Sequence, residues 1–209
     1  FKREELGLPK NAFVFCCFNQ NNKITPDIFD IWMRILKTVD KSVLWLLEDN
    51  SIAVKNLRKE AKKRKIDPKR IIFAKRMSMT NHFARHKCAD LFIDTFPYGA
   101  HTTCSDSLWA GLPIVTLMGK SFASRVASSL LNAINLEELI TTTEKEYEKL
   151  IIELANNSYR LKEIRSKLYK NRSTKPLFDT KLYTKNIELA YTKIYEKHLN
   201  KLPVKNIEI

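Results

Sequence analysis

Hydrophobic residues along this chain fall into short unbroken runs, separated by longer stretches in which apolar positions recur every three or four residues. Unbroken runs of about four to eight apolar residues are typical of strands buried on both faces of a parallel sheet, whereas the wider spacing is typical of helices. We therefore expect strands over residues 12–18, 42–47, 70–73, 91–94 and 114–117.

Helical spacing accounts for most of the remaining chain. The clearest helix start is Thr25-Pro26-Asp27, where a capping hydroxyl precedes a proline at the first helical position and an early acid. Further helices are expected over residues 52–65, 79–87, 102–110, 122–133, 136–140, 144–156, 158–171 and 180–199. Strands that alternate with helices predict an α/β fold with a Rossmann-like, doubly wound parallel sheet. We expect one domain over 1–209, with a core at about 11–140 and a helical extension at about 141–200.

Polar chemistry is concentrated directly after the strand at 91–94. A loop with Pro97 and Gly99 leads to His101, Thr102 and Thr103, at the start of a helix that ends before Gly111-Leu-Pro113. The first turn of a helix offers unpaired N–H groups and the positive end of the dipole, which suit a phosphate group. Alternatively, the threonines could be only a helix cap and the histidine only a loop donor.

Asp106 lies four residues after Thr102 and three after Thr103, so it shares their face of the helix. A carboxylate at this place suits the hydroxyls of a ribose, as in other nucleotide-binding folds. The plainer alternative is an acid that only stabilises the helix dipole.

The ligands of parallel sheets bind beyond the carboxyl ends of the strands, so the loops at 19–24, 74–79 and 95–103 are expected to meet. In the first loop, Gln20 and Lys23 are able to reach a ligand, and Lys23 suits a diphosphate unless it is simply solvated.

The third strand leads to a second set of candidate residues. The backbone near Met77 could hydrogen-bond the edge of a flat base. His82 and Arg85 follow on the short helix behind this loop, where either could instead be a surface residue.

Two familiar phosphate-binding motifs are absent. The first loop has no GxGxxG pattern, which disfavours a dinucleotide-binding Rossmann domain. Gly119-Lys-Ser121 resembles the end of a P-loop but lacks its upstream glycine.

The chain carries a net charge of +14, much of it in residues 55–76, which hold eleven Lys or Arg against two acids. The solvated helix in this segment and the turn after it contain no interleaved aromatic residues for base stacking, so we do not expect nucleic acid as the partner. An anionic nucleotide would be attracted by the same field.

Composition also bears on the compartment. The four cysteines form neither a CxxC pair nor a zinc spacing, and two of them are adjacent in an apolar run. No apolar run approaches the length of a membrane span. We expect a cytoplasmic protein. Because the chain begins at Phe1 without signal-peptide character, we expect it to be part of a longer protein.

Several linked motifs carry a resemblance to a known family. They are Phe18–Ile24, Arg70–Phe73, Ala89–Thr95 and His101–Pro113, with Ala123–Ala127 and Pro176–Thr180 further on. Over roughly residues 7–199 the chain resembles the C-terminal half of the O-GlcNAc transferase and SPINDLY-type glycosyltransferases. This resemblance implies the C-terminal lobe of a GT-B glycosyltransferase. In that fold the UDP-sugar is bound mainly by the C-terminal lobe.

The resemblance also implies roles for individual residues. His101, Thr102 and Thr103 would surround the diphosphate and sugar, and Asp106 would bind the ribose. Gln20 and Lys23 would lie at the phosphates, where Lys23 would be the catalytic group that offsets charge on the departing UDP.

On the nucleobase side, the Met77 backbone would meet the uracil, Arg85 would lie beside it, and His82 falls on a motif position. Met79 departs from the pattern, because animal members carry a lysine there. With less positive charge at this position, either Lys23 bears more of the phosphate neutralisation or nucleotide affinity is lower. The sequence has no DxD carboxylate pair, so no metal or other cofactor is expected.

The implied reaction is transfer of a sugar, with N-acetylglucosamine expected, from UDP to Ser or Thr hydroxyls of an acceptor protein or peptide. The family's acceptor-side groups lie in an N-terminal lobe and its tetratricopeptide repeats lie further upstream, so this chain alone is expected to bind UDP weakly and catalyse nothing. Two alternatives stay open. One is a GT-B protein that uses UDP-glucose, dTDP- or GDP-sugars such as GDP-fucose, or a related epimerase. The other is a non-catalytic module that binds polyanions through residues 55–76.

Overall fold

A computed structural model describes residues 1–209 of the chain, and it is built around one parallel sheet of six strands. The strands lie in the order β3-β2-β1-β4-β5-β6, and every neighbouring pair is parallel. Their bounds are β1 Phe13–Cys17, β2 Ser42–Leu47, β3 Ile71–Ala74, β4 Leu91–Ile93, β5 Ile114–Leu117 and β6 Ile140–Thr141. The chain moves outward from β1 to β3 and then returns to place β4 beside β1, which confirms the doubly wound α/β fold.

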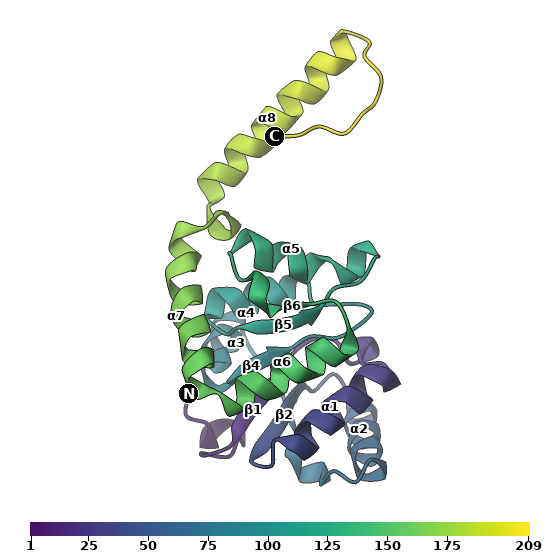
Figure 1. Cartoon of the computed structure of the whole chain (residues 1–209), viewed down its shortest axis with the longest axis vertical. Helices are drawn as coiled ribbons and strands as arrows, with labels where there is room; N and C mark the ends of the chain where they lie inside the picture. The colour runs from purple at the N-terminus through teal and green to yellow at the C-terminus, as the bar shows by residue number, and fades with distance from the viewer.

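Eight α-helices connect and cover these strands. They are α1 Pro26–Thr38, α2 Ser51–Lys63, α3 Met79–Arg85, α4 Thr102–Ala110, α5 Val126–Ala133, α6 Glu144–Asn156, α7 Ser158–Thr174 and α8 Thr180–Leu199. Short 3₁₀ turns occupy Glu4–Leu6, Asn21–Lys23, Pro68–Arg70, His86–Cys88, Phe122–Ser124, Glu137–Leu139 and Pro176–Phe178. Helices α1 and α6 lie side by side on one face of the sheet, and α3 and α4 lie on the other (Figure 1).

The expected start of α1 is confirmed in detail. The Thr25 hydroxyl accepts a hydrogen bond from the Ile28 amide, and Pro26 takes the first helical position. From this helix Trp32 reaches α6, where its indole nitrogen donates to the Tyr147 hydroxyl at 3.1 Å. Trp32 and Tyr147 are both fully buried, so this polar contact lies inside the apolar layer between the sheet and the two helices.

The core extends along the central strands, and all four cysteines lie in it as free thiols. Cys16 and Cys17 are fully buried on β1, in keeping with their expected place as small buried side chains. Burial raises the pKa of Cys17 and of Cys104 well above that of an ordinary thiol, so both stay protonated at neutral pH.

Several expected bounds shift by one to three residues, and two of the expected helices differ more from the structure. Residues 136–140 were expected to be helical, but they form a single 3₁₀ turn followed by β6, which pairs with Thr116 and Leu117 of β5. The expected helix over 122–133 is interrupted at Arg125, so that α5 begins only at Val126. In both places the segment is too short for apolar spacing to separate helix from strand or turn.

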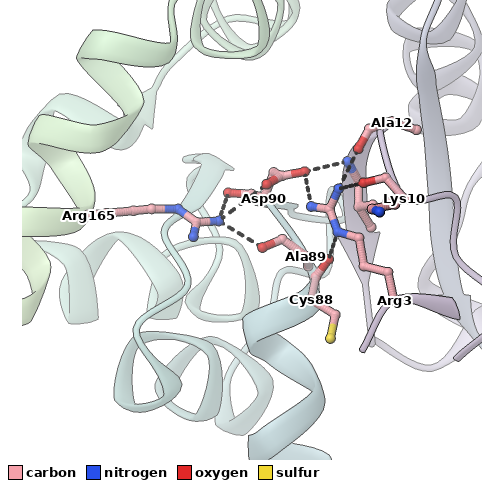
Figure 2. A network of polar contacts seen from close by, with 8 residues as sticks. Arg3, Lys10, Ala12, Cys88, Ala89, Asp90 and Arg165 are labelled. Carbon is pink, nitrogen blue, oxygen red and sulfur yellow. Dashed lines mark hydrogen bonds and ion pairs between the residues drawn. The ribbon is translucent and has the colours of Figure 1, made fainter. Parts of the chain in front are cut away.

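Residues from the lead-in segment and from α7 meet at the amino-terminal edge of the sheet (Figure 2). The Arg3 guanidinium pairs with the Asp90 carboxylate at 2.7 Å and donates to the Ala12 carbonyl at 2.7 Å. From α7, Arg165 donates to the Ala89 and Asp90 carbonyls at 2.7 and 2.8 Å. The lead-in segment and α7 are therefore both held where β1 and β4 begin.

Helix α8 projects away from the rest of the molecule, and none of its residues is buried (Figure 1). Its exposed side includes several large apolar side chains, among them Tyr183, Tyr191, Ile194 and Tyr195. Neither this helix nor any other has the length and apolar character that crossing a membrane requires.

Candidate functional site

A cavity of about 500 Å³ opens at the carboxyl-terminal edge of the sheet, where the loops after β1, β3 and β4 meet. All nine candidate residues chosen from the sequence line this one cavity: Gln20, Lys23, Met77, His82, Arg85, His101, Thr102, Thr103 and Asp106. Strand topology explains this convergence, because β1 and β4 are neighbours at the point where the winding direction reverses.

The first turn of α4 faces this cavity. His101 occupies the N-cap position, and no side chain caps the helix, so neither threonine acts as the cap. Thr102 and Thr103 are the first two helical residues, and their amides have no hydrogen-bond acceptor. These unpaired N–H groups and the positive end of the helix dipole make the turn suited to an anion. Below we call it the anion seat.

The side chains around the anion seat are themselves oriented. The Nε2 atom of His101 lies 3.2 Å from the Ala123 carbonyl, which can only accept, so Nε2 carries a proton. The Thr103 hydroxyl donates to the Asn19 side-chain oxygen at the end of β1. No local pattern pairs Asn19 with Thr103, because 84 residues separate them.

Lys23 reaches across the cavity from the loop after β1. Its Nζ donates to the Gly99 carbonyl at 3.0 Å and lies 3.8 Å from the centre of the Tyr98 ring. Partial burial lowers the pKa of Lys23, while the nearby Asp94 carboxylate partly opposes that shift. The ammonium group is thus held beside the anion seat instead of extending freely into solvent.

Arg85 is only 1% exposed, so its interpretation as a possible surface residue is wrong. Its guanidinium lies 4.4 Å from the centre of the Phe18 ring and donates to the Lys75 carbonyl at 2.7 Å. Burial lowers the pKa of Arg85 to about 10, so it remains charged at neutral pH. Its buried Nε atom has no partner. The loop that follows β3 is therefore in contact with a fixed positive charge on α3.

His82 is half-buried on the same helix and packs against Phe18 and His86. Burial, followed by the neighbouring positive charge of Arg85, lowers the pKa of His82 to about 4. His82 is therefore neutral at pH 7 and can offer a hydrogen bond to a ligand without adding charge.

Asp106 is half-buried on α4, and its carboxylate forms no hydrogen bond or ion pair. Burial raises the pKa of Asp106 above its ordinary value. An unpaired, partly desolvated carboxylate beside a cavity is well placed to accept hydrogen bonds from ligand hydroxyls.

The structure adds lining residues that the sequence analysis did not select as ligand-binding residues: Phe18, Asn19, Leu47, Arg76, Met79 and Tyr98. Arg76 is held by an ion pair with Asp49 at 3.0 Å. Asn19 and Tyr98 do carry a signal, because both belong to loops that directly follow a strand at this edge. Together the lining combines three cations, an open helix N-terminus, a single carboxylate and a few apolar side chains. Such a surface suits an elongated anion with a flat apolar end and free hydroxyls.

This fold and this site define an α/β ligand-binding domain of the doubly wound class, with its cavity at the point where strand order reverses. The particular family follows from comparison with known proteins. The model for Glycosyl transferase family 41 matches residues 1–187, and the chain belongs to that family.

Curated relatives agree with this assignment. The chain is 37% identical over 205 residues to a UDP-N-acetylglucosamine--peptide N-acetylglucosaminyltransferase of Caenorhabditis elegans, covering 98% of this chain and 18% of the relative. It is 39% identical over 198 residues to the probable enzyme SEC of Arabidopsis thaliana, covering 94% of this chain and 20% of the relative. The chain thus spans about a fifth of these relatives.

Solved structures give the same picture. A mutant of the Thermobaculum terrenum O-GlcNAc transferase matches with a TM-score of 0.84 and 29% identity, over 88% of this chain and 36% of that one. Anabaena Alr3699/HepE, solved in complex with UDP, matches with a TM-score of 0.63 and 17% identity, over 92% of this chain and 51% of that one. At that identity the second match bears on the fold alone.

Proposed function

We propose that this chain is the UDP-sugar-binding lobe of a protein O-glycosyltransferase that transfers N-acetylglucosamine from UDP to Ser or Thr hydroxyls. The observation that carries the proposal is the convergence of the anion seat, Lys23, Arg85 and Asp106 in one cavity. Membership of family 41 and the UDP-N-acetylglucosamine named for two relatives support the choice of donor.

In this proposal the diphosphate lies on the free amides of Thr102 and Thr103, with His101 and Lys23 beside it. The ribose hydroxyls donate to the Asp106 carboxylate, four residues along α4. The uracil extends toward α3, between the backbone at Met77 and the Arg85 guanidinium. Gln20 and the neutral His82 provide further hydrogen bonds along the same path.

The chemistry requires that negative charge be stabilised as UDP departs. The acceptor hydroxyl oxygen forms a bond to the anomeric carbon while the bond from that carbon to the β-phosphate oxygen breaks. The hydroxyl proton passes to a base, which we place in a further lobe that completes the enzyme. Within this chain, Lys23 and the amides of α4 stabilise the developing diphosphate charge. On this division of labour, the 209 residues alone bind the donor but do not transfer sugar.

Calorimetric titration of UDP into the 209-residue chain tests the proposal. We expect Lys23→Ala to weaken UDP binding by about 10- to 100-fold and Asp106→Ala by about tenfold, since each loses one or two polar contacts of roughly 1–2 kcal/mol. Lys55→Ala and Asp40→Ala are matched controls with the same charge changes at exposed positions outside the cavity. Both should bind as the unmodified chain does. Binding of GDP without binding of UDP would contradict the proposal.

A further inference from the structure

Asp94 is a buried carboxylate that lies directly beneath the cavity without lining it. It follows β4 and is 1% exposed. One oxygen, Oδ1, accepts from the Ala100 amide at 2.7 Å, the Thr95 amide at 2.8 Å and the Asn19 carboxamide at 3.0 Å. The other, Oδ2, accepts from the Thr116 hydroxyl at 2.7 Å. No positively charged side chain forms an ion pair with this carboxylate, so these donors provide its direct compensation for burial.

One of these bonds leads to Lys23. The amide that Ala100 donates to Asp94 and the carbonyl that Gly99 offers to Lys23 belong to the same peptide group. That peptide is therefore held from opposite sides, by a carboxylate below and an ammonium group above. Since a peptide group is planar and rigid, its orientation on Asp94 fixes the direction of the carbonyl that holds the Lys23 ammonium.

A second branch leads to the anion seat. The Asn19 carboxamide donates to Asp94 at 3.0 Å and to the Thr95 hydroxyl at 2.7 Å, which fixes its orientation. Its oxygen then accepts from the Thr103 hydroxyl at the second residue of α4. Asp94 is thus linked to both sides of the proposed phosphate position through no more than one intervening group.

The surroundings leave Asp94 little freedom to move. Its backbone carbonyl accepts from the buried Tyr147 hydroxyl at 2.7 Å. A Cβ atom placed on Gly99 would lie only 3.0 Å from Oδ2, so the loop is seated closely on the carboxylate. A group held this tightly can transmit its position to its neighbours.

We propose that Asp94 is the positioning residue of this site, setting the place of the Lys23 ammonium through the Gly99–Ala100 peptide and that of Thr103 through Asn19. This inference rests on the proposed function in so far as those two groups bind a nucleoside diphosphate. It adds that the site depends on a carboxylate that never touches the ligand.

The test compares four variants of the 209-residue chain by UDP titration and by amide hydrogen exchange at Ala100. Asp94→Ala removes every acceptor, whereas Asp94→Asn keeps an oxygen toward Ala100 and Thr95 and can donate to Thr116. Leu36→Ala makes a cavity in the core near the opposite edge of the sheet, where Arg70 donates to the Leu36 carbonyl. Asn19→Ala removes the branch to Thr103 together with the Asn19 donor to Asp94, but it leaves the Ala100 amide on Asp94.

We expect Asp94→Ala to weaken UDP binding at least 30-fold and to speed exchange of the Ala100 amide at least 100-fold. Asp94→Asn should restore UDP affinity to within about fivefold of the unmodified chain. Asn19→Ala should weaken UDP binding about tenfold while the Ala100 amide stays protected. Leu36→Ala should lower the melting temperature but leave UDP affinity within twofold.

Two results would overturn the inference. One is UDP affinity in Asp94→Ala equal to that of the unmodified chain. The other is an equal loss in Leu36→Ala, which would make the effect one of stability alone. If Asp94→Ala does not fold, two measurements decide in its place. They are the UDP affinity of Asn19→Ala and that of Asp94→Asn, each compared with the unmodified chain. If the unmodified chain does not bind UDP, the proposed function fails, and exchange at Ala100 in Asp94→Asn and Asp94→Ala still decides whether the carboxylate holds the loop.

Discussion

Met79 occupies the position at which the resemblance to the family led us to expect a lysine. It is the first residue of α3, it is 57% exposed, and it lines the cavity. Replacing an exposed apolar side chain there by a cation would add attraction for a diphosphate. We expect Met79→Lys to raise UDP affinity roughly threefold to tenfold at low salt, or ~1 kcal/mol, with the gain shrinking as salt is added.

The control for this prediction is Asn81→Lys. It adds the same charge two residues further along α3, at an exposed position outside the cavity. Its UDP affinity, measured by the same titration, should change less than twofold. An equal gain in both variants would mean that only long-range attraction matters at this edge.

His82 in α3 and His86 in the turn after it predict that the chain loses stability in acid. Burial is the main cause that lowers the pKa of His82 and of His86 to about 4, from an ordinary value of 6.5. Folding therefore favours their neutral forms, and stability is lost as the pH falls from about 6.5 through 4. Asp94 acts in the opposite sense, because burial raises its pKa to about 6 and its contribution to stability is lost as the pH rises from 3.8 to 6.

Melting temperatures measured from pH 4 to 8 check this prediction. We expect a net fall below pH 6.5, and a smaller fall in His86→Gln, whose amide can still donate to the His82 carbonyl that His86 now contacts at 2.6 Å. Asp94→Asn should steepen the fall, since it removes a group whose raised pKa opposes the loss of stability in acid. The groups that face Asp94 are Lys23, Cys17, Cys104 and Tyr147, and of these the thiols and the phenol stay uncharged over this range because burial raises their pKa values. A flat profile in the unmodified chain would contradict the assignment.

At the scale of single residues, the sequence could locate side chains at an edge but could not pair them. Lys23 was expected near a phosphate because of the strand it follows, and the structure places it beside the anion seat. That its ammonium holds the Gly99 carbonyl depends on a contact between residues 76 positions apart. From the sequence, Asp94 was expected only at the end of a strand. No local pattern indicates which donors will surround a carboxylate in the folded chain.

Among the elements, α4 ends at a glycine whose conformation other residues rarely adopt. Gly111 has a φ of 84°, and its amide bonds back to the Leu108 and Ser107 carbonyls. We expect Gly111→Ala to destabilise the chain by about 1 kcal/mol, which lowers the melting temperature by roughly 2–4 °C. Gly111→Asn should cost less, because asparagine tolerates the left-handed region.

Since Gly111 lies at the far end of α4 from the anion seat, UDP affinity should be unchanged in both variants. A loss of affinity in Gly111→Ala that matches its loss of stability would show that the whole helix moves when its end is strained. Calorimetry of unfolding and of UDP binding on the same samples separates these outcomes.

The elements that apolar patterning predicted well are those with clear ends. Residues 42–47 and 114–117 form strands with the expected bounds. The first run lies between Lys41 and Glu48, and the second begins after Pro113 and ends just before Met118-Gly119. The segment at 140–141 gave no such signal, because a strand of two residues has no periodicity of its own. Its place was decided by the open edge of β5, which is a property of the sheet.

For the whole molecule, α8 adds length without adding to the core. None of its residues is buried, whereas α7 buries Leu161, Ile164 and Leu168. We expect removal of residues 180–209 to change the melting temperature by less than about 2 °C and to leave UDP affinity unchanged, since the cavity has no lining residue from α8. Removal from residue 158 onward should unfold the chain or lower its melting temperature sharply. A large loss in the shorter deletion would show that α8 packs on the rest of the molecule in solution.

The arginine contacts of Figure 2 have a practical consequence for how the chain can be joined to other polypeptides. Because Arg3 holds the lead-in where β1 and β4 begin, anything fused ahead of Phe1 enters at the rim facing away from the ligand mouth. A surface tether or a fluorescent partner attached there leaves nucleotide entry unhindered. The same attachment in the loop at 119–121, next to the Ala123 carbonyl that His101 contacts, would crowd that entry.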